Sequence, residues 1–82
     1  MTEITDIKAK PDTVRVGIYR HYKGQYYQVI GLAQHSETEE NLVVYRALYG
    51  SYGLWVRPLK NFMDYVEVSD KLTPRFQWVA PD

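Results

Sequence analysis

The sequence contains no cysteine, and this absence excludes three kinds of site at once. Disulfide bonds, thiolate-bound zinc and cysteine nucleophiles all need that side chain. No stretch approaches the roughly 20 apolar residues of a transmembrane helix, and the first 14 residues lack the apolar centre of a signal peptide. We therefore expect a cytoplasmic protein that makes no contact with a membrane.

Net charge is also lacking, because ten lysine and arginine residues balance ten aspartate and glutamate residues. A neutral chain lacks the sustained positive field that non-specific binding to duplex nucleic acid requires. The charges are unevenly distributed, however. Residues 15–35 and 42–62 each contain three basic residues and no acidic one, whereas Glu37, Glu39 and Glu40 lie between them. This pattern leaves room for a local anion site on the basic stretches.

Motifs for phosphate binding and hydrolysis are absent as well. The five glycines are spread along the chain and are not gathered into a phosphate-binding loop. No two carboxylates lie within the expected strands, where a hydrolase would hold its acid and its base. We therefore predict no catalytic residue, no metal ion and no cofactor, and a binding function in place of catalysis.

Aromatic residues are abundant, with eight tyrosines, two tryptophans and two phenylalanines in 82 residues. They favour β-strands and exposed contact surfaces alike. A chain of this length forms one domain with a small core. We expect a flexible N-terminal arm over residues 1–13 and a single domain over residues 14–82.

Short alternating runs of β-branched and aromatic residues, separated by turn residues, predict an antiparallel, mostly β protein. Gly24 suits the positive φ of a tight hairpin, Gly31 marks a bulge, and Pro58 ends a strand because it has no N–H to donate. Five to six short strands with one short helical turn are typical of a small SH3-like barrel, and an OB-like barrel is the nearest alternative. The expected elements are strands over 16–22, 25–35, 42–49, 54–57, 65–68 and 75–79 and a helical turn over 58–62.

Several segments, taken in order, resemble a known family of small bacterial proteins. They are Gly17–Gly24, Tyr26–Tyr27, His35–Thr38, Val43–Gly50 and Leu54–Pro58. Their combination is similar to the family catalogued as "domain of unknown function 1653", and the resemblance covers about residues 16 to 79. It implies a compact bacterial domain and brings no catalytic or binding residues to transfer.

Alternation along the strands divides the side chains between two faces. The even-numbered positions are mostly aliphatic and predict the core, whereas the odd-numbered positions predict an outer aromatic and basic surface. The alternative is that the tyrosines pack on the core with their hydroxyls at the rim, as a bulge at Gly31 would favour. The residues expected to be almost fully buried are Ile18, Ile30, Val44, Leu48 and Val56.

The odd-numbered face offers flat rings for stacking together with histidine and arginine donors. This suits an anionic or planar ligand, namely a nucleotide, a single-stranded nucleic acid segment or an acidic peptide. A methylated ammonium ligand is disfavoured because the nearby basic residues repel a cation. The residues predicted to bind the ligand are His21, Tyr27, His35, Tyr45, Trp55 and Arg57.

Two other classes of function stay open. The first is a small enzyme or ligand-sensing domain that uses His21, His35 and Arg57. The second is a dimerisation unit that buries its tyrosines against a second copy. We expect a monomer or a weak homodimer.

The segment from His35 to Glu40 combines a histidine, hydroxyls and carboxylates, but residues adjacent in sequence rarely converge into a catalytic set. Ser36 and Glu39 have the spacing of a capping box, and we predict that structural role. A metal site built from His21, His35 and a glutamate is the weaker alternative, because two histidines fourteen residues apart lack a characteristic spacing.

Overall fold

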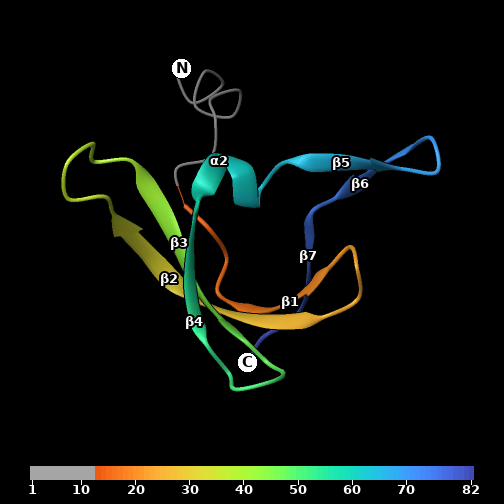
Figure 1. Ribbon diagram of the computed structural model, residues 1–82, viewed down its shortest axis with the longest axis horizontal. Helices are drawn as coiled ribbons and strands as arrows, with labels where there is room; N and C mark the ends of the chain where they lie inside the picture. The colour runs from red at the N-terminus through yellow and green to blue at the C-terminus, as the bar shows by residue number, and fades with distance from the viewer. Residues whose placement is uncertain (1–12) are drawn as a thin grey trace, which may run out of the picture.

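The structure, a computed structural model, describes residues 13–82, which form seven β-strands and one short helix (Figure 1). The prediction of a mostly β, antiparallel protein with one helical turn is confirmed. Except for Thr13, the predicted arm over residues 1–13 lies outside the described residues. The elements are β1 (Gly17–His21), β2 (Tyr26–Gln34), β3 (Asn41–Ala47), β4 (Leu54–Pro58), α2 (Leu59–Phe62), β5 (Tyr65–Val68), β6 (Lys71–Pro74) and β7 (Phe76–Ala80).

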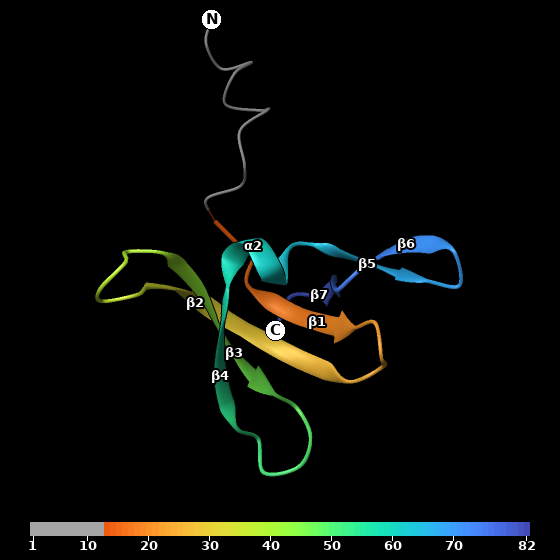
Figure 2. The ribbon, with the colours of Figure 1, turned by 45° about the horizontal axis from the view of Figure 1, so that its top comes forward.

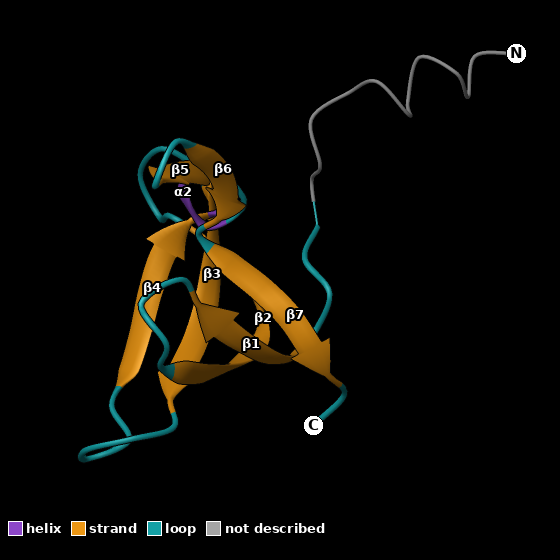
Figure 3. Cartoon of the chain, turned by 90° about the vertical axis from the view of Figure 1, so that its right-hand side faces the viewer, coloured by secondary structure: helices purple, strands orange, loops and turns teal. Residues whose placement is uncertain are grey.

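Five strands form one antiparallel sheet in the order β4-β3-β2-β1-β7, and β5 pairs with β6 in a separate hairpin. The sheet is strongly bent, so that β4 and β7 rise on opposite sides of an interior with β1 and β2 below it (Figures 1 and 3). The helix α2 lies over the open end of this interior, as Figure 2 also shows. In the described part of the chain, β4 and β7 do not pair with each other, so the sheet does not close into a barrel.

Glycines and a bulge produce the bends of the sheet. The register of β2 against β3 shifts between Val29 and Gly31, which confirms the predicted bulge. Gly24 has the predicted positive φ, 111°. Gly17 has a φ of 136°, and a Cβ added there would lie 2.7 Å from the Ala80 carbonyl oxygen. The start of β1 can therefore approach the end of β7 this closely only with glycine.

The hydrophobic core lies on the concave, inner face of the sheet and is largely aromatic. On β1, β3 and the first half of β2, this face carries the odd-numbered residues. The bulge reverses the alternation in the second half of β2, so that Leu32 packs against the core, while Ile30 in the bulge is exposed. The core residues are Val14, Tyr19, Val29, Val43, Tyr45, Leu59, Phe62 and Phe76.

The predicted aliphatic core is therefore wrong. Ile30 exposes 48% of its surface and Val56 exposes 58%, while Ile18, Val44 and Leu48 are only half-buried. These residues lie on the convex side of the bent sheet. The alternative, in which tyrosines pack on the core, is the one that the structure adopts for two of the core residues.

The size of the aromatic rings explains which face is buried. Only a few residues from one sheet and one short helix are available to fill the interior. Aromatic side chains suit this best, because each buries about 150 to 250 Å². Phe62 of α2 stacks on Phe76 of β7 with centroids 4.1 Å apart and planes 7° apart. The rings of Tyr19 and Tyr45 contact Phe62 at centroid distances of 5.2 and 5.6 Å. Aromatic rings from three strands and the helix therefore fill the interior of the bent sheet.

The hairpin of β5 and β6 contains the one strand, β6, that the sequence analysis missed. Ser69 and Asp70 form its turn, and both have a positive φ. The return strand, Lys71–Pro74, has no clear alternation and ends in proline, so its sequence resembles a loop. No helix within residues 13–82 is long and apolar enough to cross a membrane.

Candidate functional site

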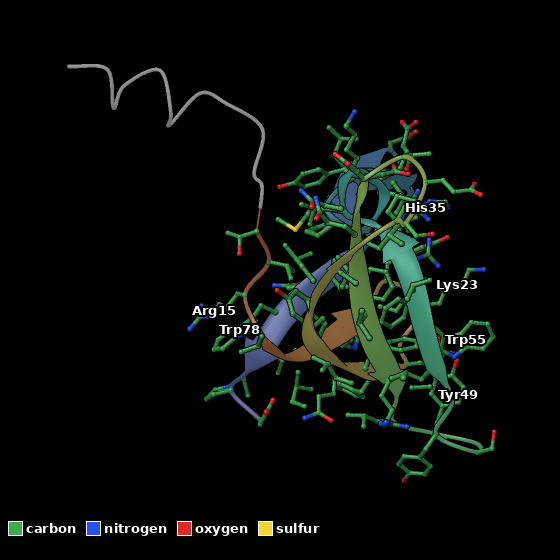
Figure 4. The ribbon with its side chains drawn as sticks, turned by 90° about the vertical axis from the view of Figure 1, so that its left-hand side faces the viewer. Arg15, Lys23, His35, Tyr49, Trp55 and Trp78 are labelled. Carbon is green, nitrogen blue, oxygen red and sulfur yellow. The ribbon has the colours of Figure 1, made fainter. Side chains whose placement is uncertain are left out.

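An open pocket of about 190 Å³ lies beside edge strand β4, at the rim of the concave face. Trp55 and Tyr49 project at this edge, as Figure 4 shows. Four of the six residues predicted to bind a ligand meet here, and Tyr49 joins them. The pocket is lined by Tyr27, Tyr45, Tyr49, Trp55 and Arg57.

The strand register explains why these side chains converge. Trp55 of β4 lies opposite Tyr45 of β3, and two positions further along β4 Arg57 lies opposite Val43. Tyr27 of β2 lies opposite Ala47 on the other side of β3. Residues directly opposite each other in an antiparallel pair place their side chains on the same face, so one face of three neighbouring strands supplies the pocket.

Arg57 is the charged group of the pocket, and it is half-buried. Its Nε donates a hydrogen bond to the Tyr45 hydroxyl at 3.2 Å, and its Nη1 donates to Asn61 Oδ1 at 2.6 Å. Its guanidinium carbon lies 5.4 Å from the centre of the Phe76 ring. Among residues 13–82 it forms no salt bridge with a carboxylate. A guanidinium has five N–H donors, so several remain for a ligand.

The tyrosine hydroxyls add neutral donors to the pocket. The hydroxyls of Tyr27 and Tyr49 lie 2.8 Å apart and share a hydrogen bond. Burial, together with this hydrogen bond, raises the pKa of Tyr27 to about 12, so its hydroxyl stays protonated at physiological pH. One hydroxyl proton of the pair is then left to donate to a third group.

His21 lies next to the pocket but does not line it. Its ring centroid lies 4.8 Å from that of Phe76 and 6.2 Å from that of Tyr27. Burial lowers the pKa of His21, and the positive charges of Arg57, Lys23 and Arg75 lower it further. The Lys23 backbone N–H donates to its Nδ1 at 3.2 Å, which suits the neutral ring. Burial and the nearby basic side chains therefore both disfavour the protonated form of His21.

His35 does not reach the pocket, because it lies in the turn between β2 and β3. Figure 4 shows it at the opposite end of the molecule from Tyr49. In the part of the chain that the structure describes, no three histidine, aspartate or glutamate side chains come together as metal ligands. The six residues predicted to bind the ligand therefore do not form one site, since four line the pocket and His35 lies in a distant turn.

The predicted capping box in this turn is wrong. The imidazole Nδ1 of His35 accepts the backbone N–H groups of Glu37 at 3.1 Å and Thr38 at 3.4 Å. The Glu39 N–H donates to the His35 carbonyl at 2.8 Å. The hydroxyl of Ser36 makes no hydrogen bond within residues 13–82. The longer imidazole begins one residue earlier and reaches the N–H groups of the turn.

Sequence reasoning missed two residues of this region. Tyr49 has the odd-numbered parity of the aromatic face, but it lies two residues beyond Ala47, the last residue of β3, and is not among the residues predicted to bind the ligand. Asn61 carries no motif of its own. Its one signal is its position four residues after Arg57, across the proline that precedes the helical turn.

Comparisons with known proteins agree with the sequence resemblance. The family described as "Protein of unknown function (DUF1653)" matches residues 17–78. The chain is also similar to a protein of this family from Bordetella bronchiseptica whose crystal structure is known. The two are 39% identical with a TM-score of 0.77, over 84% of this chain and 91% of that one. No curated protein matches the sequence.

Proposed function

We propose that this chain, which belongs to the DUF1653 family, is a small binding module whose pocket takes an anionic, planar ligand of the nucleotide type. The ligand is a free nucleotide or a nucleotide of a single strand. The observation that carries this proposal is a half-buried arginine without a carboxylate partner in residues 13–82, placed beside an exposed indole.

The charge of Arg57 supports an anionic ligand. A guanidinium held by two neutral partners keeps its full positive charge, and it binds phosphate or carboxylate through charge-assisted hydrogen bonds. The hydroxyl pair of Tyr27 and Tyr49 supplies a neutral donor at the same pocket. A cationic ligand would instead be repelled.

The rings and the size of the pocket support a planar ligand. Trp55 is 57% exposed, so a face or edge of its indole is free to stack against a base. A volume of about 190 Å³ is smaller than the roughly 300 Å³ at which pockets for drug-sized molecules begin. Such a pocket suits one ring or one charged group of a ligand that extends beyond it.

The enzymatic alternative loses one of its three residues to this arrangement. His35 is used in a turn away from the pocket, which leaves His21 and Arg57 without a second histidine. No specific observation favours the dimerisation unit. A binding module therefore stays the leading proposal.

We also propose that the bent sheet is an open variant of the SH3-like barrel, in which the edge strands β4 and β7 do not pair, with an inserted hairpin. A meander of four strands, a short helical turn and a last strand that returns to the first support this assignment. The β5–β6 hairpin is then the insertion, since it lies between the helical turn and β7. In this architecture the pocket lies at the edge formed by β4.

Calorimetric titration of the purified protein tests the binding proposal. The probes are adenosine monophosphate, a short single-stranded oligothymidine and an acidic peptide without aromatic residues. We expect the two nucleotide probes to bind. Arg57→Ala should weaken them by about 1.5 to 3 kcal/mol, the scale of a hydrogen bond to a charged group. Binding of the acidic peptide alone would replace the nucleotide proposal by a peptide one.

Arg20→Ala is the matched control for this titration. Arg20 is also a basic strand residue, but it lies exposed on β1 and outside the pocket. Its removal should leave probe affinity nearly unchanged. Equal losses in the two variants would indicate non-specific electrostatic attraction, and wild-type protein that binds none of the three probes would refute the proposal.

A further inference from the structure

We propose that Asn61 is a positioning residue that holds the Arg57 guanidinium at the pocket without cancelling its charge. The inference rests on the proposed function, because it explains how the pocket keeps a free positive charge near the Asp64 carboxylate. It assigns a role in ligand selection to a residue outside the pocket lining.

The helical turn α2 places Asn61. Leu59 and Phe62 of this turn are buried and fix it against the sheet. The Met63 N–H donates to the Leu59 carbonyl at 3.0 Å, which closes the turn. Asn61 lies between the two buried residues, and its Oδ1 accepts from Arg57 Nη1 at 2.6 Å. The core thus fixes the partner of the arginine.

The other end of the Asn61 amide faces an ion pair. Its Nδ2 donates to Asp64 Oδ2 at 3.5 Å. Asp64 in turn accepts two hydrogen bonds from Arg75, at 2.7 Å to Oδ1 and at 3.3 Å to Oδ2. An amide has one accepting and one donating end, so this orientation satisfies both neighbours and the reverse orientation satisfies neither.

The two arginines of this network therefore differ in charge balance. Arg75 is neutralised by the carboxylate of Asp64, in the one salt bridge found within residues 13–82. Arg57 is held by a neutral amide and a neutral phenol. Asn61 separates the two, because it stands between the Arg57 guanidinium and the Asp64 carboxylate. The ligand best served by this arrangement carries a phosphate or carboxylate group that completes the pairing of Arg57.

The test is the substitution Asn61→Asp, which keeps the size of the side chain and its accepting oxygen. The new carboxylate should pair with Arg57 through the oxygen that already accepts from it, while its second oxygen turns away from Asp64, and a ligand anion would then have to compete with it. We expect the affinity for oligothymidine to fall about tenfold or more, the equivalent of one charge-assisted hydrogen bond. The slope of log affinity against log salt should also become shallower by about 0.7, one ionic contact with a single strand.

Asn41→Asp is the control for the added negative charge. Asn41 is the other asparagine of the chain, and it lies at the start of β3, outside the pocket lining. This variant has the same net charge as Asn61→Asp, and its affinity should stay within about twofold of the wild type. Equal losses in the two variants would attribute the effect to net charge and overturn the inference.

A measurement on the protein without ligand tests the inference even if none of the probes binds. In nitrogen–proton correlation NMR spectra of the arginine side chains, the Arg57 signals should shift in Asn61→Ala while the Arg20 signals stay in place. Unchanged Arg57 signals would overturn the positioning role. If the wild type binds and Arg57→Ala weakens binding, but Asn61→Asp binds like the wild type, this inference fails alone. Wild-type protein that binds no probe refutes the proposed function instead.

Discussion

The two faces of the five-stranded sheet use different chemistry. The concave face is aromatic, and it holds both the core and the pocket. The convex face is more aliphatic, yet Ile30, Leu54 and Val56 on it are each about half exposed. Hydropathy alone would bury the convex face. The contrast indicates that in a small bent sheet the curvature and the volume of the rings decide which face becomes the core.

Phe76 shows how closely the core and the pocket are joined. Its ring stacks on Phe62 in the centre of the core and meets Tyr45 and Tyr27 at centroid distances of 5.6 and 5.5 Å. Those two tyrosines line the pocket. The inner wall of the pocket is therefore formed by rings that pack on the core. A ligand would contact side chains that are already held in place.

The largest effect that the comparison predicts is a difference in stability between the faces. Phe76→Ala should cost about 3 to 5 kcal/mol, because it removes a ring from the centre of the concave core. Val56→Ala should cost less than about 1 kcal/mol, because that side chain is more than half exposed. Urea denaturation of both variants measures this, and similar losses would show that both faces contribute to the core.

The next prediction concerns the turn between β2 and β3. His35→Ala should lower the free energy of unfolding by about 1 kcal/mol, because its imidazole accepts two backbone N–H groups. Ser36→Ala is the neighbouring control and should change stability by less than about 0.5 kcal/mol. Neither variant should alter probe binding at the pocket. A larger loss of stability for Ser36→Ala than for His35→Ala would show that Ser36, and not His35, caps this turn.

A smaller effect should appear in the pH dependence of stability. Folding lowers the pKa of His21 from about 6.5, chiefly through burial, so the unfolded chain takes up the proton first. The stabilisation is present above about pH 6.5 and is lost as the pH falls through the folded pKa. His21→Phe should flatten this part of the profile. An unchanged slope in chemical denaturation at several pH values would exclude His21 as its source.

The smallest predicted effect is spectroscopic. Tyr49→Phe removes the hydrogen bond to Tyr27 and the charge that opposes its ionisation. The pKa of Tyr27 should then fall from about 12 and stay above 10, since burial is its largest cause. NMR titration of the tyrosine rings measures this shift. A pKa of Tyr27 that does not move would show that the hydroxyl pair is not formed in solution.

Six of the seven strands could be predicted from the sequence because their signals are local. Alternating runs, the turn at Gly24 and the bulge at Gly31 each depend on a few neighbouring residues. The buried face could not be predicted, because alternation defines two faces without saying which one is concave. The prediction placed the more hydrophobic, aliphatic face in the core. The structure instead buries the face that carries the larger aromatic rings.

The candidate site was predicted in part for the same reason. Tyr45, Trp55 and Arg57 share one parity on adjacent strands, so whichever face they occupy, they occupy it together. His35 has the same parity, but the bulge lies between it and Tyr27, and its strand ends before it. Parity counts fail across a bulge and beyond a strand end. The role of Asn61 could not be predicted from the sequence, because it depends on where α2 lies relative to Arg57.

The most direct test of the central claim, that the concave face carries a ligand site at β4, is an NMR titration of the two tryptophan indole N–H signals with adenosine monophosphate. Trp55 lines the β4 pocket, whereas Trp78 lines a separate groove with Tyr19 and Tyr65. Trp55→Phe assigns the two signals. We predict that the Trp55 signal shifts with saturation while the Trp78 signal stays in place. A saturating shift of Trp78 alone, or no shift of either signal, would contradict the account.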